Sequence, residues 1–500
     1  MASTFHVEHF GCRAARADGE AVSERLRVAG LCERQPAAAD VVVVNTCSVT
    51  AEADRTARAF IRRAHRLNPE AKIVVTGCYA QRAPEELAGL AGVAAVVGNS
   101  NKGLAPEIIL GLAQGVEGAT LKGHGFSRAA ETPHADAALA AEGMQLNPHG
   151  LVRVESLLSG RPSAPIWADD RFAHSFLEEA QMAPGAQTRP NLKIQKGCGN
   201  RCTFCVIPQT RGSSKSLPAA AVLRQVEGFV DAGGNELVLS GINLGRWGRD
   251  LPGSEGAAPR TLAGLAREIF ERTALNRLRL SSIEPMDWDA ELIGLMAEFG
   301  RPEHGVARLA RHAHLPLQSG SDAVLRRMHR RYRPWHYVEK VEALVRAAGP
   351  ELTLGADVMA GFPGETDGEF EETMALVRAL PFGYLHLFPF SPRPGTPGWA
   401  LHAERPVPAE SVEDRMQALR ALAAEKSETH RKRFVGRELE AITLHTPAEL
   451  EAQNRTAALT ENFLPVELDG RLGANQLVRV RVTGLTSKGA LEATAVEKSP

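Results

Sequence analysis

The sequence has no long apolar run and no excess of charge of either sign. No stretch approaches the roughly 18 consecutive apolar residues that a membrane span needs, and residues 1–9 lack the apolar core of a secretory signal. The formal net charge of −1 excludes a uniformly basic nucleic-acid binder, although it leaves room for local basic faces. We therefore expect a cytoplasmic protein without a membrane segment, built from several domains because 500 residues exceed a single core.

Cysteine is scarce as well, and its pattern excludes the common structural sites. The chain has seven cysteines, and neither a second C-x2-C pair nor an H-x3-H pair joins the single C-x2-C motif. Structural zinc sites usually take two separated pairs of ligands, so zinc is disfavoured. A cytoplasmic protein keeps its thiols reduced, which argues against structural disulfides and for metal or redox chemistry.

Three of the cysteines are grouped in one loop, residues 196–212. Cys198, Cys202 and Cys205 follow C-x3-C-x2-C spacing, close enough to bind one metal centre. Three ligands are one fewer than a closed iron–sulfur or zinc site takes, whereas sites that perform chemistry leave a coordination position open. The spacing therefore indicates a cluster with one free iron. The alternative is a zinc knuckle, or reduced cysteines that lie close together by chance.

The N-terminal segment, to about residue 115, alternates strand and helix signals. Strands are predicted at 5–10, 41–46 and 72–77. Helices are expected from about residue 18 and after Thr50, which is a typical N-cap residue. This alternation is typical of an open parallel α/β sheet.

A cysteine follows each of these three predicted strands: Cys12, Cys47 and Cys78. The carboxyl ends of parallel strands line one crevice, so the three thiols can converge on a second cluster with an open iron. Buried, unreactive cysteines are the alternative. Cys32 has no such placement, and we interpret it as structural.

Residues 189–432 repeat strand and helix signals six times, which predicts a full or partial parallel (β/α) barrel. The expected strands are 192–195, 236–240, 277–281, 312–318, 352–359 and 383–388. Active sites of such barrels lie at the carboxyl ends of the strands. Polar or glycine-rich motifs follow these strands, and we expect them to shape one cavity. Ordinary turn chemistry is the alternative for any single motif.

Two further segments complete the chain. Residues 119–188 are rich in Ala, Gly, Pro and His, and we interpret them as a linker or insertion that is partly disordered. Residues 433–500 contain strand-like runs such as 477–483, in which valines alternate with Arg479 and Arg481. This alternation predicts a small antiparallel barrel with a basic outer face.

Two groups of arginines are candidate contacts for the phosphates of RNA. The helix after Thr50 would carry one group on a single face: Arg55, Arg58, Arg62 and Arg66. The second group is the densest basic run, residues 326–333, in which Arg326, Arg330 and Arg333 are the predicted phosphate contacts. A solvated helix surface is the alternative for both groups.

Together these features resemble the methylthiotransferases, a radical S-adenosylmethionine family. The most specific pieces are the cysteine loop with Phe204 before its last cysteine, residues 44–50, residues 75–81 and residues 390–396. The run Thr50-Ala-Glu-Ala-Asp-Arg55 and residues 279–285 are most similar to the branch that modifies threonylcarbamoyladenosine in tRNA.

The resemblance implies an α/β architecture of three parts joined by the linker at 119–188. Residues 1–118 would form an N-terminal parallel α/β methylthiotransferase domain. Residues 189–432 would form the radical core, a partial (β/α)6 barrel. Residues 433–500 would form a small all-β barrel of the TRAM type.

The resemblance also implies two 4Fe-4S clusters and S-adenosylmethionine. Cys198, Cys202 and Cys205 would be the catalytic ligands of the cluster that reduces S-adenosylmethionine and releases a deoxyadenosyl radical. Cys12, Cys47 and Cys78 would hold an auxiliary cluster whose open iron carries the sulfur to be inserted. Contacts to the cofactor are expected from residues near the strand ends: Phe204, Glu236, Ser240, Asn243, Glu284, Gln318 and Asp357.

The implied activity is insertion of a 2-methylthio group into threonylcarbamoyladenosine next to the anticodon. The expected partners are the anticodon stem-loop of tRNA, an electron donor such as flavodoxin or ferredoxin, and a sulfur donor, and we expect a monomer. Within the family, the alternatives are isopentenyladenosine in tRNA and an aspartate of a ribosomal protein. An alternative of another class is an iron–sulfur protein without turnover that transfers electrons or binds RNA.

Overall fold

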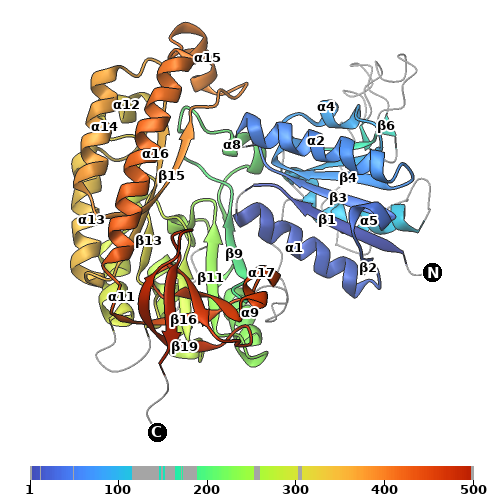
Figure 1. The fold of residues 1–500 in the computed structure, drawn as a ribbon. Coiled ribbons are helices and arrows are strands. Elements are labelled where there is room, and N and C mark those ends of the chain that lie inside the picture. Colours follow the sequence, from blue (N-terminus) through green and yellow to red (C-terminus); the bar gives the residue numbers. More distant parts are fainter. Residues whose placement is uncertain are drawn as a thin grey trace. The chain divides into compact units, whose positions relative to one another are not determined.

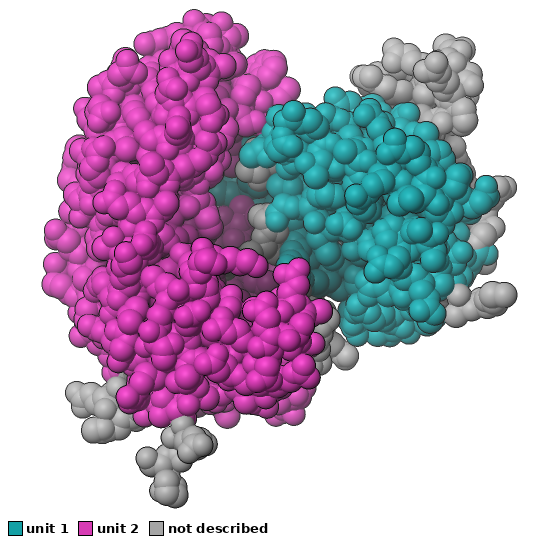
Figure 2. All heavy atoms as spheres, in the orientation of Figure 1, with its two compact units in different colours: residues 1–178, 197–199, 206–213 teal, residues 179–196, 200–205, 214–500 magenta. Residues whose placement is uncertain are grey.

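The computed structural model describes residues 3–11, 13–48, 50–114, 146–147, 150–151, 164–170, 172, 188–252, 260–301 and 307–496. Cys12 and most of the predicted linker therefore lie outside the described residues. The chain forms two compact units (Figure 2). Unit 1 comprises residues 1–178, 197–199 and 206–213, and unit 2 comprises residues 179–196, 200–205 and 214–500. The domain boundaries expected from the sequence stay predictions.

Unit 1 is built on a parallel sheet with the strand order β2-β1-β3-β4-β5-β8 (Figure 1). The strands are β1 (Thr4–His9), β2 (Cys32–Glu33), β3 (Val41–Thr46), β4 (Lys72–Gly77), β5 (Val93–Gly98) and β8 (Ile166–Trp167). The predictions for β3 and β4 are confirmed to the residue, and β1 begins one residue before the predicted strand. The other three strands were not predicted. The short β2 carries Cys32 with its side chain exposed, so the thiol is not a core residue.

Helices pack on both faces of this sheet. They are α1 (Arg13–Val28), α2 (Ala51–Leu67), α3 (Cys78–Arg82), α4 (Pro84–Ala88) and α5 (Ala105–Ala113), with 3-10 turns at Pro36–Ala38 and Asn99–Leu104. Alternate side chains of β3 face opposite sides: Val42 and Val44 share a core with Phe60 of α2, whereas Val41 and Val43 share a core with α1 and α5. A strand buried on both faces is what its unbroken valine run predicts.

The start of α2 agrees with the predicted cap. The side-chain oxygen of Thr50 accepts a hydrogen bond from the backbone N–H of Ala53 at 3.2 Å. On the arginine face, Arg55 pairs with Glu52 of its own helix, and Arg58 donates to the hydroxyl of Tyr79. Two of the four arginines thus have partners within unit 1. The contact of all four with RNA stays a prediction.

Unit 2 contains the predicted partial barrel as two sheets of parallel strands (Figure 1). One sheet is β9 (Asn191–Lys196), β11 (Glu236–Gly241) and β12 (Arg277–Leu280), with β10 (Lys215–Ser216) antiparallel at its edge. The other is β13 (His312–His314), β14 (Thr353–Ala360) and β15 (Phe382–Pro389). A parallel bridge between Leu278 and Leu309 connects the two sheets. The α/β class and the partial (β/α)6 barrel are confirmed.

β13 ends four residues before the predicted strand does. The cause is local, because Pro316 has no N–H to donate to a ladder. Gln318 also adopts a positive φ of 65°, outside the extended region. Residues 315–318 therefore leave the sheet as a loop, although Gln318 keeps an isolated bridge to Val358 of β14.

Helices follow the barrel strands along the chain. They are α9 (Ala219–Asp231), α10 (Leu262–Arg272), α11 (Ala290–Gly300), α12 (Asp322–Arg327), α13 (Pro334–Ala348), α14 (Asp367–Ala379), α15 (Pro397–Glu404) and α16 (Ala409–Lys432), with 3-10 turns at Leu244–Arg246 and Pro285–Asp287. None of the helices in the described part of the chain is long and apolar enough to cross a membrane.

The C-terminal segment of unit 2 closes into a barrel in the order β16-β17-β18-β20-β19. Its strands are β16 (Glu438–Thr443), β17 (Arg455–Thr460), β18 (Pro465–Asp469), β19 (Leu477–Leu485) and β20 (Leu491–Ala495), with α17 (Ala448–Ala452) between β16 and β17. As predicted, Val480 and Val482 are buried, while Arg479 and Arg481 are exposed. One pair, β18 with β20, runs parallel, so the prediction of an antiparallel barrel is correct except at this pair.

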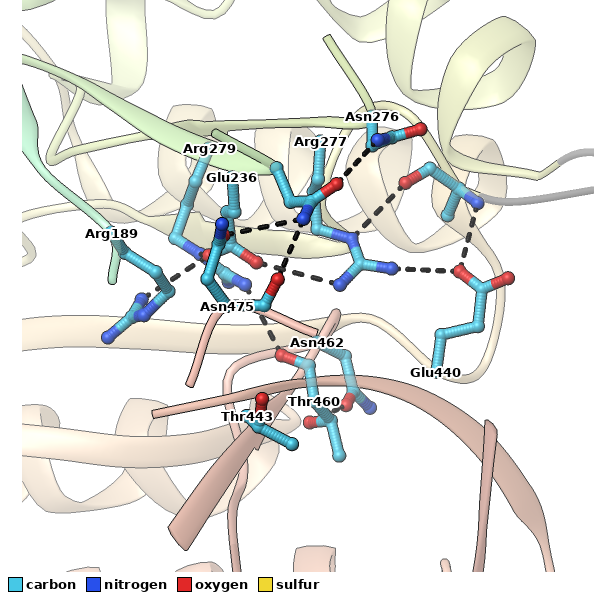
Figure 3. A network of polar contacts seen from close by, with 12 residues as sticks. Arg189, Glu236, Asn276, Arg277, Arg279, Glu440, Thr443, Thr460, Asn462 and Asn475 are labelled. Carbon is cyan, nitrogen blue, oxygen red and sulfur yellow. Dashed lines mark hydrogen bonds and ion pairs between the residues drawn. The ribbon is translucent and has the colours of Figure 1, made fainter. Parts of the chain in front are cut away.

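A buried ion network joins this barrel to the radical core (Figure 3). The carboxylate of Glu236 lies 3.0 Å from Arg279, 3.3 Å from Arg189 and 3.5 Å from Arg277. Arg277 also pairs with Glu440 of β16 at 2.9 Å, and Arg279 donates to the carbonyl of Thr460 at 3.2 Å. Burial alone would raise the pKa of the Glu236 carboxyl, but the arginines hold it below its usual value.

The contact of Glu236 with the cofactor stays a prediction, and the placement of this residue argues against it. Glu236 is the first residue of β11, at the opposite end of the strand from Ser240. Active sites of such barrels form at the carboxyl ends of the strands. Glu236 instead holds the C-terminal barrel against the amino ends of β11 and β12.

Candidate functional site

In unit 1, the strand order places two cysteines at the edge of the sheet where ligands of open α/β folds bind. The order reverses between β1 and β3, and ligands of open α/β sheets bind at such reversals, outside the carboxyl ends of the strands. Cys47 follows the last residue of β3, and Cys78 follows the last residue of β4. Those two last residues are register partners, so the cysteines leave the sheet at neighbouring positions. The predicted third ligand, Cys12, comes after β1 but lies outside the described residues.

The glycine that precedes Cys12 lets the backbone pass close to the sulfur of Cys47. Gly11 has a positive φ of 105°, and a side chain there would place its Cβ only 2.6 Å from the Sγ atom of Cys47. Only glycine allows this close approach without strain. The chain is therefore shaped to pass directly beside the Cys47 thiol.

The Sγ atom of Cys78 lies among hydrogen-bond donors. Arg211, the last residue of α8 (Ile207–Arg211), brings its Nε to 3.3 Å, and Asn99 brings its amide nitrogen to 3.4 Å. Burial alone would raise the pKa of this thiol, but Arg211, Asn99 and Lys102 together hold the pKa below its usual value. The pocket therefore favours the thiolate, the form that binds metals.

Asp18 balances the positive charge beside Cys78. One of its carboxylate oxygens accepts from Arg211 at 3.1 Å and from Lys102 at 3.1 Å. Lys102 also donates to the side-chain oxygen of Asn45 at 3.0 Å. These partners fix the direction of the Arg211 guanidinium toward the sulfur. The donor set suits an iron–sulfur cluster, whose sulfurs accept hydrogen bonds.

In unit 2, the cysteine loop is held by backbone hydrogen bonds. The N–H of Cys205 donates to the carbonyl of Cys202 at 3.1 Å, which closes a turn between the two thiols. Between them, Thr203 donates to the carbonyl of Met328 at 3.1 Å and accepts from the N–H of Gly398 at 2.7 Å. Cys198, which groups with unit 1, donates its N–H to the carbonyl of Gly212 at 3.1 Å. All three cysteines are partly exposed, so a ligand can reach them.

Arg330 occupies a position that corrects its predicted role. Its side chain is buried, with one terminal nitrogen 3.3 Å from the Sγ atom of Cys202 and the other 2.5 Å from Glu284. Burial would lower the pKa of the guanidinium, but Tyr332, Glu284 and Cys202 hold it well above its usual value. A buried arginine cannot contact phosphate in solvent, so the prediction for Arg330 was wrong. Its positive charge belongs to the cysteine site.

Most of the other candidate contacts lie at or near the carboxyl ends of the barrel strands. Ser240 donates its hydroxyl to the carbonyl of Leu192 at 3.4 Å, and the N–H of Asn243 donates to the side chain of Gln195 at 2.8 Å. The side-chain oxygen of Gln318 is buried and accepts no hydrogen bond within the part of the chain that is described. This oxygen is therefore available to a bound donor. The roles of these residues and of Phe204 in cofactor binding stay predictions.

Asp357 lies within β14, paired in register with His386 of β15. Burial alone would raise the pKa of its carboxyl, but the neighbouring imidazoles of His314 and His386 hold it well below its usual value. Asp357 is therefore ionised at neutral pH. The two histidines that pair with Asp357 were not predicted from the sequence.

Comparison with known proteins gives matches over most of the chain. Residues 4–98 match the uncharacterized protein family UPF0004, and residues 192–377 match the radical SAM superfamily. A Rickettsia prowazekii protein named threonylcarbamoyladenosine tRNA methylthiotransferase MtaB is 31% identical over 95% of this chain and 94% of its own length. The chain belongs to the methylthiotransferase family of radical S-adenosylmethionine enzymes. The predicted family and the prediction of an enzyme are confirmed.

Two branches of the methylthiotransferase family are similar to the chain to the same degree. A Bacillus subtilis protein also named threonylcarbamoyladenosine tRNA methylthiotransferase MtaB is 32% identical over 93% of this chain and 90% of its own length. A Cereibacter sphaeroides protein named tRNA-2-methylthio-N(6)-dimethylallyladenosine synthase is 31% identical over 95% of each chain. Overall identity therefore does not separate the two substrates.

A solved structure supports the fold of this methylthiotransferase. The radical S-adenosylmethionine methyltransferase TsrM from Kitasatospora setae superposes with a TM-score of 0.50, covering 81% of this chain and 78% of its own, at 17% identity. At that identity the likeness concerns the fold alone.

Proposed function

We propose that this methylthiotransferase inserts a methylthio group at carbon 2 of threonylcarbamoyladenosine in the anticodon stem-loop of tRNA. The observation that carries the proposal is near-full-length similarity to proteins that bear this name, from Rickettsia prowazekii and Bacillus subtilis. The run Thr50-Ala-Glu-Ala-Asp-Arg55, which is most similar to that branch, supports the same choice. The protein named for dimethylallyladenosine is equally similar, so that nucleoside is the second candidate.

The radical site would be formed by Cys198, Cys202 and Cys205 as ligands of a 4Fe-4S cluster. When bound, this cluster supplies the electron that cleaves S-adenosylmethionine and produces a radical able to remove hydrogen from an aromatic carbon. Arg330 holds a positive charge at the Cys202 sulfur, and Glu284 fixes its guanidinium through the second terminal nitrogen. The backbone bonds of Thr203 keep the turn between two of the ligands rigid.

The auxiliary site would be formed by Cys12, Cys47 and Cys78 as ligands of a second 4Fe-4S cluster. The Cys78 sulfur receives hydrogen bonds from Arg211 and Asn99, an arrangement that suits a cluster ligand. Arg211 follows the radical-site cysteines in the same loop, so one short segment serves both sites. An electron donor and a sulfur donor complete the proposed reaction.

The first test is mass spectrometry of tRNA nucleosides from cells with and without the gene. We expect 2-methylthio-threonylcarbamoyladenosine to disappear without the gene and to return with the wild-type gene. Complementation with a Cys202→Ala variant should not restore it. Loss of the dimethylallyl counterpart instead would transfer the assignment to the second candidate. If neither nucleoside changes, the proposal of a tRNA substrate is wrong.

Arg211 gives a prediction about the auxiliary cluster. In a Cys202→Ala background, where the radical cluster is impaired, Arg211→Met should lower the midpoint potential of the remaining cluster by roughly 60 mV or more. This shift equals about 1.4 kcal/mol per electron, a typical value for one charged hydrogen bond. Redox titration followed by electron paramagnetic resonance measures it.

Two controls sharpen this prediction. Arg211→Lys keeps the positive charge and should lower the midpoint potential less than Arg211→Met does. Arg62→Met removes an exposed arginine of α2 and should leave the midpoint potential unchanged. An unaltered potential in Arg211→Met would show that the guanidinium does not tune the cluster.

The exposed arginines near α12 give a prediction about tRNA binding. Arg326, unlike Arg330, is exposed and remains a candidate for phosphate contact. Arg331, which the sequence reasoning did not single out, is exposed as well, whereas the contact predicted for the half-buried Arg333 stays a prediction. If both exposed arginines bind phosphate, Arg326→Gln with Arg331→Gln should reduce the slope of log affinity against log salt by about two. Filter binding across a salt series measures the slope, with Arg272→Gln on α10 as the control. An unchanged slope would show that neither arginine contacts phosphate and that both lie on an ordinary solvated surface.

A further inference from the structure

Two histidines that the proposed chemistry does not use, His314 and His386, flank Asp357, which is one of the predicted cofactor contacts. His314 of β13, Asp357 of β14 and His386 of β15 each offer one ligand atom, and these atoms lie within 4.8 Å of one another. A carboxylate oxygen of Asp357 is 3.4 Å from Nε2 of His314 and 3.3 Å from Nδ1 of His386. The three strands are neighbours in one parallel sheet, which fixes the backbone beneath all three side chains.

Both ring nitrogens of His314 have a polar neighbour. Nδ1 lies 2.7 Å from the hydroxyl of Ser282, which fixes the orientation of the ring. Its Nε2 is buried and makes no hydrogen bond of ordinary geometry among the described residues. The group that Nε2 faces is the carboxylate of Asp357, at 3.4 Å, a distance longer than a good hydrogen bond.

We propose that His314, Asp357 and His386 bind one divalent metal ion. Bonds of about 2.1 Å in a tetrahedral arrangement separate neighbouring ligand atoms by about 3.4 Å. The separations of 3.4 Å and 3.3 Å on either side of Asp357 match this value. The contact of Ser282 with the far nitrogen of His314 is the arrangement that orients metal-binding histidines.

The ligand types select the class of metal ion. Two imidazoles and a carboxylate suit Zn²⁺, Fe²⁺ or Mn²⁺, whereas Mg²⁺ and Ca²⁺ prefer oxygen ligands alone. Three protein ligands leave at least one coordination position open for water or a substrate group. The side chain of His386 is 59% exposed, so an ion can enter from solvent without unfolding the sheet. The group contains no cysteine, so its ligand set differs from the cysteine sets of both proposed clusters.

The test is a titration of the reconstituted full-length protein with Mn²⁺, followed by electron paramagnetic resonance of the free ion. Mn²⁺ is the probe because thiolates bind it weakly, so any incomplete cluster site competes little. We expect about one Mn²⁺ bound per chain, displaced by Zn²⁺ added in slight excess. Asp357→Asn and His386→Ala should each weaken binding at least 10-fold, and Ser282→Ala should weaken it less.

A matched control removes an exposed histidine elsewhere. His445→Ala, in the C-terminal barrel, should leave Mn²⁺ binding unchanged. Because His386 is exposed, His386→Ala should also keep its thermal unfolding midpoint and its cluster absorbance. Absence of stoichiometric Mn²⁺ binding by the wild type, or equal binding by the wild type and His386→Ala, would overturn the proposal.

Discussion

Replacing Cys202 with alanine is expected to abolish cleavage of S-adenosylmethionine, lowering its rate by about three orders of magnitude or more. The change removes one of three thiolates proposed to hold the radical-site cluster. It also removes the sulfur that lies 3.3 Å from the buried guanidinium of Arg330. The measurement is 5′-deoxyadenosine formed by the anaerobically reconstituted protein, together with iron and sulfide per chain. We expect iron to fall to about half of the wild-type content, because the proposal has two clusters of equal size.

The matched variants are Cys78→Ala and Cys32→Ala. Cys78→Ala should keep part of the S-adenosylmethionine cleavage but lose methylthio insertion, because it removes a ligand of the auxiliary site only. Cys32→Ala removes an exposed thiol of β2 and should change neither iron content nor activity. A Cys78→Ala protein that still inserts sulfur would contradict the proposed auxiliary site.

Replacing Glu236 with glutamine should destabilise unit 2 by about 3 kcal/mol or more, since the change leaves buried arginines without their carboxylate. The side chains of Glu236, Arg277 and Arg279 are fully buried. Their charges therefore have no water to replace the missing partner. The measurement is the midpoint of urea unfolding compared with the wild type. The docking of the C-terminal barrel should weaken in the same variant, because Arg277 and Arg279 also bind that barrel.

Lowering the pH should reduce the difference in unfolding free energy between the Glu236→Gln variant and the wild type. The folded-state pKa of Glu236 is held below its usual value, so its stabilisation is present above the unfolded pKa of about 4.3. That stabilisation is lost as pH falls through the folded-state pKa. Glu298→Gln is the control, because its partner Arg267 is on the surface and exposed ion pairs contribute little. Equal midpoints for Glu236→Gln and Glu298→Gln would refute the role of the network.

The amino-acid pattern predicted the strands that carry the proposed chemistry. The valine run of β3 and the apolar run of β4 identified both strands to the residue, because a strand buried on both faces needs an unbroken apolar segment. The cysteines after these strands could then be placed at one edge of the sheet. The edge strand β2 was missed because only two of its residues pair, too few to produce a periodic pattern.

The roles of individual charged residues could not be predicted in the same way. Arg330 stands in a run of arginines that differ in exposure, and only the packing of that segment shows that its side chain is buried against Cys202. Glu236 belongs to a predicted strand, yet the direction of β11 places it at the opposite end from the predicted site. Local sequence carries no information on which distant group a long side chain meets.

The sequence by itself indicated the family, through its resemblance to the methylthiotransferases. It also predicted most of the barrel strands and the grouping of the cysteines, because spacing along the chain fixes which side chains share a loop or a strand end. Tertiary structure alone decided the partners of those side chains. Arg211 reaches Cys78 across 133 positions, and His314 and Asp357 come from different strands of one sheet. The first contact arises because α8 packs against α3, and the second because strands far apart in the chain pair in register. Both depend on the whole fold, which therefore sets the electrostatics of each site.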